Sequence, residues 1–199
     1  AVILKIVGGE LELRDVVFAG ASDVNTPRRY LSQKVLLKTG LMIDGGAVVF
    51  IADSTFESAT DTMIRVLDGS NLKCNQCTFN NNEGSDGGAV SVKDSSARFD
   101  GCHMKSNKAK SSGGAIHFEG SSCDNGPETS LKIHGTTFKE NKATHSGASI
   151  YVNCAKEAKI SGSEFQSEFA NDGGAAYIKN INTLKVDDSA FLKNGADGS

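Results

Sequence analysis

Five cysteines are the most reactive side chains of this 199-residue chain. Cys74 and Cys77 are separated by two residues, a spacing that occurs in redox and zinc sites. A structural interpretation competes with this one, because Cys74 takes a position that large apolar residues hold elsewhere in the chain, and Cys77 takes a position of Ser, Thr or Val. Small buried thiols suit both positions. Cys102 recurs at the position of Cys77, so we expect these two thiols to stack, close enough to oxidise.

Cys123 and Cys154 each follow the same kind of apolar segment in consecutive repeats. Both fall where a turn is expected, so the repeat brings them close together. We predict a disulfide between them, which would indicate an oxidising compartment and an extracellular or cell-surface location. The alternative is a pair of free surface thiols. The odd number of cysteines leaves at least one thiol unpaired.

Carboxylates and histidines are the other side chains that could catalyse a reaction or bind a metal ion. General acid–base catalysis and calcium binding both require acids that cluster. Asp53, Asp100 and Asp187 share one region of the repeat, but Gln76 and Gly135 interrupt the series. The four histidines occupy four different repeat positions: His103, His117, His134 and His145. We therefore expect no catalytic residue, no metal site and no cofactor.

Basic residues recur at one repeat position and form what we call the basic row: Lys73, Arg98, Lys132, Lys159 and Lys185. Like charges at strand spacing repel one another unless acids or a ligand compensate them. The row would suit a linear polyanion, such as a sulfated or uronic-acid polysaccharide. The alternative is that flanking acids, Asp100 and Asp187 among them, neutralise the row and nothing binds.

A second recurring position ends in three aromatic side chains, the aromatic row: His117, Tyr151 and Tyr177. We expect this row to point outward from a neighbouring strand, where it would add stacking against sugar rings. Solvated or mutually stacked side chains are the alternative for both rows.

These residues are positioned by a repeat of roughly 20–26 residues with three apolar pairs in each copy. One copy contains Val90 and Val92, Ala97 and Phe99, and Cys102 and Met104. The other copies begin with the pairs Leu4/Ile6, Leu41/Ile43, Ile64/Val66, Ile116/Phe118, Ile150/Val152 and Ala176/Ile178. A spacing of two is typical of a short strand with one buried face. Turn-forming Gly, Asn, Asp and Ser lie between the pairs. The pattern predicts an all-β fold, a right-handed parallel β-helix solenoid of about seven three-strand rungs.

Two insertions interrupt the repeat, at about residues 19–39 and 119–130. They contain the two prolines, Pro27 and Pro127, which a central strand would exclude. We interpret residues 1–199 as a single β-helix domain, an excerpt of a longer solenoid or a body with covered ends. The expected partners at both ends are therefore neighbouring solenoid segments or subunits.

Two tetrapeptides carry a resemblance to a known family. GGA[IVL] occurs at Gly87–Val90 and Gly113–Ile116, and FxxN at Phe79–Asn82 and Phe138–Asn141. These motifs resemble the repeats of the chlamydial polymorphic membrane proteins, which are surface autotransporter passengers, within the pectate-lyase-like β-helix superfamily. The Asn is expected to adopt the left-handed conformation at a turn and to form a ladder with its neighbours. The glycines are expected to permit a close backbone approach at a bend.

The net charge of −3 argues against a general attraction to nucleic acid or to an acidic membrane. The longest apolar run is too short to cross a bilayer. We therefore expect a non-enzymatic extracellular repeat module, an adhesin-passenger-like spacer and binding surface for a glycan or a cell-surface receptor. The alternatives are a structural subunit of an extracellular filament or appendage, and a pectate-lyase-like enzyme acting on polysaccharide.

Overall fold

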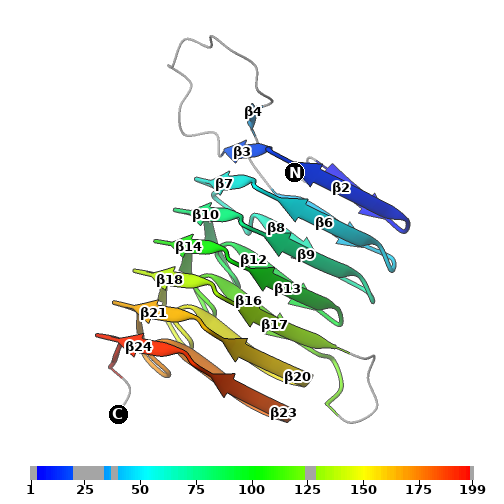
Figure 1. Ribbon diagram of the computed structural model, residues 1–199. Helices are drawn as coiled ribbons and strands as arrows, with labels where there is room; N and C mark the ends of the chain where they lie inside the picture. The colour runs from blue at the N-terminus through cyan, green and yellow to red at the C-terminus, as the bar shows by residue number, and fades with distance from the viewer. Residues whose placement is uncertain (1–3, 20–33, 37–39, 124–128, 198–199) are drawn as a thin grey trace, which may run out of the picture.

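The computed structural model describes residues 4–19, 34–36, 40–123 and 129–197. These residues form a parallel β-helix whose rungs stack along one axis, from the N-terminal rung at the top of Figure 1 to the C-terminal rung at the bottom. The first strands of successive rungs follow one another in chain order, so each rung pairs only with its neighbours. The predicted parallel β-solenoid is confirmed, and it makes about six turns, slightly fewer than the seven rungs predicted.

The first two strands of every rung belong to one twelve-stranded sheet. The first strands are β1 (Leu4–Val7), β5 (Leu41–Asp44), β8 (Ile64–Val66), β12 (Val90–Lys93), β16 (Ile116–Glu119) and the first halves of β20 (Ile150–Ser161) and β23 (Ala176–Asp187). The second strands are β2 (Glu10–Arg14), β6 (Val48–Ala52), β9 (Asn71–Asn75), β13 (Ser96–Asp100), β17 (Ser130–His134) and the second halves of β20 and β23.

The third strands form an eight-stranded sheet, and a further short strand builds a five-stranded sheet. The third strands are β3 (Val17–Ala19), β7 (Thr55–Glu57), β10 (Thr78–Asn80), β14 (His103–Lys105), β18 (Thr137–Lys139), β21 (Glu164–Gln166) and β24 (Ala190–Leu192), joined by β4 (Lys34–Leu36). The short strands are β11 (Glu83–Gly84), β15 (Lys108–Ala109), β19 (Lys142–Ala143), β22 (Phe169–Ala170) and β25 (Gly195–Ala196).

The short fourth strand was not predicted, since two residues are too few to show a period. Its inward residue is always small, as in Gly84 and Ala109, because the backbone there approaches the next layer closely. A Cβ on Gly84 would lie 2.6 Å from the Thr62 hydroxyl oxygen. The last five rungs therefore have a fourth, narrow side.

The predicted apolar pairs form the core. Val90 and Val92 are fully buried, while Ser91 between them points outward, as the spacing of two requires. Aromatic rings at one third-strand position stack along the axis, with 4.6 Å between the ring centroids of Phe138 and Phe165. Identical positions therefore pack against each other from rung to rung, and this packing holds the register.

The predicted asparagine ladder is present, but the predicted backbone conformation of its members is wrong. The Nδ2 of Asn82 donates to the Oδ1 of Asn107, and the Nδ2 of Asn107 to the Oδ1 of Asn141, both at 3.0 Å. The left-handed residue is the one before the ladder position, such as Asn81 with φ of 54° and Ser106 with φ of 55°. That residue makes the corner and faces solvent, which lets the Asn side chain turn inward and bond the corner backbone.

The glycine pair of the GGA motif permits the close approach that was expected. Gly87 has φ of 68°, and a Cβ on it would lie 2.1 Å from the carbonyl oxygen of Val90. A Cβ on Gly88 would lie 2.4 Å from the carbonyl oxygen of Gly114 in the next rung. Any side chain at these two positions would push the bend open.

The predicted insertions are slightly shorter in the structure, because Ala19 belongs to β3, Glu119 to β16 and Ser130 to β17. Within the first insertion, β4 pairs in parallel with β3. Residues 20–33, 37–39 and 124–128 of the predicted insertions lie outside the described residues.

Candidate functional site

The basic row lies on the second strands, in register from one rung to the next. Strand pairing places Lys73 beside Arg98, Arg98 beside Lys132, Lys132 beside Lys159, and Lys159 beside Lys185. The side chains point away from the core because their neighbours on each strand, such as Leu131 and Ile133, fill the interior. The row therefore runs along the solenoid axis with one basic side chain per rung, about 4.8 Å apart.

Acids compensate part of this charge. Arg98 Nε lies 2.7 Å from Asp100 Oδ2, and Lys185 Nζ lies 3.4 Å from Asp187 Oδ2. The hydrogen bond and charge of Asp100 raise the pKa of Arg98. Lys132 pairs with Glu157 of the next rung at 2.8 Å. The flanking acids Asp100 and Asp187 thus hold two of the five basic groups.

Two members of the basic row have no carboxylate partner among the described residues. Lys73 Nζ lies 5.5 Å from the ring centroid of Phe50. Lys159 is half-buried and forms no ion pair with any residue in the described part of the chain. The row therefore carries more positive than negative charge, with Lys159 near its C-terminal end.

A shallow hollow of about 200 Å³ opens across the basic row in three consecutive rungs. Its lining is Arg98, Asp100, Lys132, Ile133, His134, Lys159 and Ser161. The Nδ1 of His134 and the hydroxyl of Ser161 are hydrogen-bonded at 3.0 Å. Asp100 Oδ1 is buried and has no hydrogen-bond partner. Every other buried side-chain nitrogen or oxygen among the described residues has at least one partner.

The aromatic row lies on the first strands. Its rings stack on one another, with centroids 4.8 Å apart between His117 and Tyr151 and 5.8 Å apart between Tyr151 and Tyr177. Tyr151 therefore has its two faces covered, and the row presents ring edges to solvent. A sugar ring stacks on a free face, so the middle of this row offers no such platform.

His117 in the aromatic row is largely enclosed, with 13% of its side chain exposed. Burial lowers its pKa, although Asp86 and Glu119 lie 3.9 Å and 3.7 Å from its Nε2. Nowhere in residues 4–19, 34–36, 40–123 and 129–197 do three or more His, Cys, Asp or Glu side chains form a group that could hold a metal ion.

The two rows face different sides of the core. Figure 1 shows the second strands β9, β13 and β17 in front of the first strands β8, β12 and β16. The inward residues of both sets pack in one core, so their outward residues point away from each other. The basic row and the aromatic row are therefore separate surfaces.

The cysteines behave as two groups. Cys123 and Cys154 form the predicted disulfide, with their Cα atoms 4.4 Å apart. Cys74, Cys77 and Cys102 are free thiols with no exposed surface. Burial raises the pKa of Cys74, which keeps it in the unreactive thiol form. The structural interpretation of the Cys74–Cys77 spacing fits this environment.

Glu168 is a titratable residue that sequence reasoning missed. It takes the ladder position that Asn holds in neighbouring rungs and is 1% exposed. Its carboxylate accepts hydrogen bonds from the Ser149 hydroxyl and, at 3.4 Å, from Asn141 Nδ2. Burial raises the pKa of Glu168 to about 8. The signal was in the sequence, because FxxE replaces FxxN in the same rung in which Ser149 replaces the alanine of GGA.

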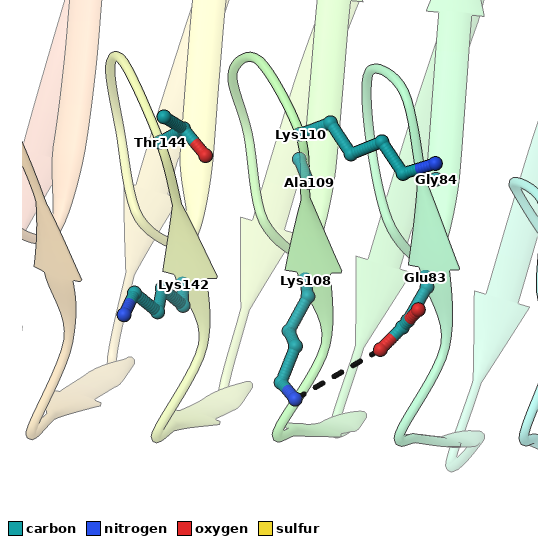
Figure 2. A pocket seen from close by; sticks show the side chains of 7 residues that line it. All are labelled: Glu83, Gly84, Lys108, Ala109, Lys110, Lys142 and Thr144. Carbon is teal, nitrogen blue, oxygen red and sulfur yellow. Dashed lines mark ion pairs between the residues drawn. The ribbon is translucent and has the colours of Figure 1, made fainter.

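A second, larger hollow of about 340 Å³ lies on the narrow fourth side (Figure 2). Its floor is made by Gly84 and Ala109, and the side chains of Lys108, Lys110 and Lys142 surround it. The Nζ of Lys108 lies 3.8 Å from Oε1 of Glu83. Lys142 points away from these two residues, and its Nζ lies over the ring of Phe169. These lysines do not converge on one point, but they form a second basic surface. This surface is an alternative to the basic row as a binding site for a polyanion.

Comparison with known proteins places the chain in a family. A family model described as the right handed beta helix region matches residues 21–131, which is more than half of the chain. No curated protein and no solved structure gives a significant match. In the described residues no helix has the length and apolar character needed to cross a membrane. The architecture fits the pectate-lyase-like superfamily, and the chain belongs to the right-handed β-helix family.

Proposed function

We propose that this domain is a non-enzymatic extracellular module, adhesin-passenger-like, that binds a linear polyanionic glycan along its basic row. The observation that supports the proposal most directly is the register of the row. Five basic side chains lie on adjacent strands, and two of them, Lys73 and Lys159, are not held by carboxylates.

A linear polyanion fits this row because its charges and those of the row repeat along one direction. Each bound anionic group would gain a charge-assisted hydrogen bond and would relieve the repulsion between neighbouring basic groups. Charges that lie more than about one Debye length from the row, roughly 8 Å at physiological salt, are largely screened. The negative net charge of the chain therefore does not oppose this local attraction.

The disulfide supports an extracellular location. Cys123 and Cys154 join the start of the second insertion to the bend of the next rung. Disulfides persist in oxidising compartments. A surface module of this kind would act both as a spacer, through its length, and as a contact surface, through its side.

The test is retention on a heparin column at neutral pH, compared between the wild type and the variant Lys132→Glu, Lys159→Glu, Lys185→Glu. We expect the wild type to elute only with added salt and the variant to pass through. The matched control reverses three lysines around the second hollow, Lys108→Glu, Lys110→Glu and Lys142→Glu, with the same change in net charge.

Retention that the control abolishes and the basic-row variant keeps would assign binding to the fourth side instead. Retention that neither variant changes would reject the proposal. Incubating the protein with the glycan and measuring the chain length afterwards tests the non-enzymatic part, since a lyase or hydrolase would shorten the chains.

A second candidate function is a subunit of an extracellular filament, which requires that a solenoid layer of another subunit can stack on an apolar rung. Three large apolar side chains at inward positions of the last described rung are between 44% and 48% exposed: Leu184, Val186 and Phe191. Inward positions of this kind are covered by the next layer in every inner rung. Stacking of another solenoid layer on this rung would bury them, and sedimentation of concentrated protein would reveal end-to-end association.

A further inference from the structure

The hollow on the basic row combines groups that a simple polyanion would not need. Its three rungs contribute three pairs, each made of residues two apart on one strand: Arg98 and Asp100, Lys132 and His134, and Lys159 and Ser161. The first residue of each pair is basic, whereas the second has a side chain that can form hydrogen bonds. The hollow therefore has a charged side and a hydroxyl-binding side.

Asp100 is the unusual member of this set. Its Oδ2 accepts a hydrogen bond from Arg98 Nε at 2.7 Å, whereas its buried Oδ1 accepts none. A buried acceptor without a donor destabilises the folded state. A carboxylate that served only to neutralise Arg98 would be at least as stable in a fully solvated position.

Asp187 shows what such a solvated acid looks like. It stands in the same relation to Lys185 as Asp100 does to Arg98, two residues further along the strand. Its side chain is 39% exposed, against 18% for Asp100. Asp187 does not line the hollow, so it is a matched control for the charge of Asp100.

The geometry points to Asp100 as the acceptor for a ligand hydroxyl, in a subsite for an acidic sugar whose anionic group lies on Lys132 and Lys159. This inference rests on the proposed function and specifies its ligand. Because Oδ1 lies below the surface, the carboxylate must rotate about its Cβ–Cγ bond to reach the hollow, a rotation for which aspartate has a broad, shallow potential.

The inference separates two ligand classes. A sulfated or uronic-acid saccharide carries hydroxyl groups beside its anionic groups, so it would satisfy the lysines and Asp100 together. Linear polyphosphate has charge of the same sign and a similar repeat, but its internal units have no hydroxyl to donate. For polyphosphate, Asp100 would be only a repulsive charge.

The experiment measures dissociation constants for heparin and for linear polyphosphate with the wild type and the variants Asp100→Ala, Asp100→Asn and Asp187→Ala. We expect Asp100→Ala to weaken heparin binding roughly fivefold. The variant loses one hydrogen bond to a charged group, and the removal of a charge of the same sign as the ligand offsets part of that loss. The same variant should strengthen polyphosphate binding. Asp100→Asn removes the charge and keeps an acceptor oxygen, so it should bind heparin at least as tightly as the wild type.

Asp187→Ala should strengthen the binding of both ligands. The inference is overturned if Asp100→Ala strengthens heparin binding as Asp187→Ala does, or if Asp100→Ala and Asp100→Asn bind heparin equally, since the charge alone would then explain the result. Those outcomes leave the proposed function intact. If the wild type binds neither ligand, the proposed function fails, and the subsite is rejected with it.

Discussion

Replacing the buried carboxyl of Glu168 should change how the stability of the solenoid depends on pH. The folded state raises the pKa of Glu168 from its ordinary 4.5 to about 8, mainly through burial. A raised carboxyl pKa means that the folded state binds the proton more tightly than the unfolded state does. The contribution of this proton is therefore fully present below pH 4.5, and it is lost as the pH rises toward 8.

The magnitude follows from the two pKa values. Each pKa unit corresponds to about 1.4 kcal/mol, so the loss between pH 5 and pH 8.5 is at most about 4 kcal/mol. Relaxation of the surroundings and entry of water reduce it, and we expect about 2–3 kcal/mol. The ionised carboxylate would retain the bonds from Ser149 and Asn141, which also limits the loss.

The assay is urea unfolding followed by far-ultraviolet circular dichroism, because the chain has no tryptophan. Wild type and Glu168→Gln are compared at several pH values between 5 and 8.5, with the disulfide intact. Gln resembles the protonated carboxyl and does not titrate, so the difference between the two proteins isolates Glu168. We expect similar stability at pH 5 and a more stable variant at pH 8.5. A difference that stays constant with pH, or that grows toward acid, would refute the argument.

Two further predictions test the stacking and the redox state. Phe138→Ala should lower the free energy of unfolding by about 3–5 kcal/mol, because it leaves a cavity in a fully buried stack beside Phe165; a cost under about 1 kcal/mol in urea unfolding would show that the stack can collapse around the gap. Mass mapping without reductant should link the peptides that contain Cys123 and Cys154 and leave Cys74, Cys77 and Cys102 as thiols; recovery of Cys123 and Cys154 as alkylatable thiols from oxidised protein would contradict the disulfide.

The sequence predicted the rungs well because the information lies in local spacing. Two apolar residues separated by one outward residue, such as Val90 and Val92, specify both a strand and its buried face. Repetition of the pair then specifies the register between rungs. The members of the basic row and of the aromatic row can therefore be predicted from the sequence alone. The disulfide was predictable for the same reason, since Cys123 and Cys154 fall at one bend of consecutive rungs.

Other features depend on side-chain direction, which spacing does not supply. The pairing of Arg98 with Asp100 on its own strand, and of Lys132 with Glu157 of the next rung, follows from rotamers of long side chains. The left-handed corner falls on Asn81 rather than Asn82 because the ladder needs the side chain of Asn82 inside. Glu168 was missed because a charged residue was not expected at an inward position.

Binding of a linear polyanionic glycan to the basic row should show in the salt dependence of heparin affinity. Dissociation constants for one heparin oligosaccharide should be measured over a range of salt concentrations for the wild type and for the Lys132→Glu, Lys159→Glu, Lys185→Glu variant. Binding to a row of cations releases counterions, so the wild-type affinity should fall steeply and linearly on a logarithmic salt scale. We expect the variant to lose most of this slope together with its affinity. Equal slopes and equal affinities for the two proteins would contradict this expectation.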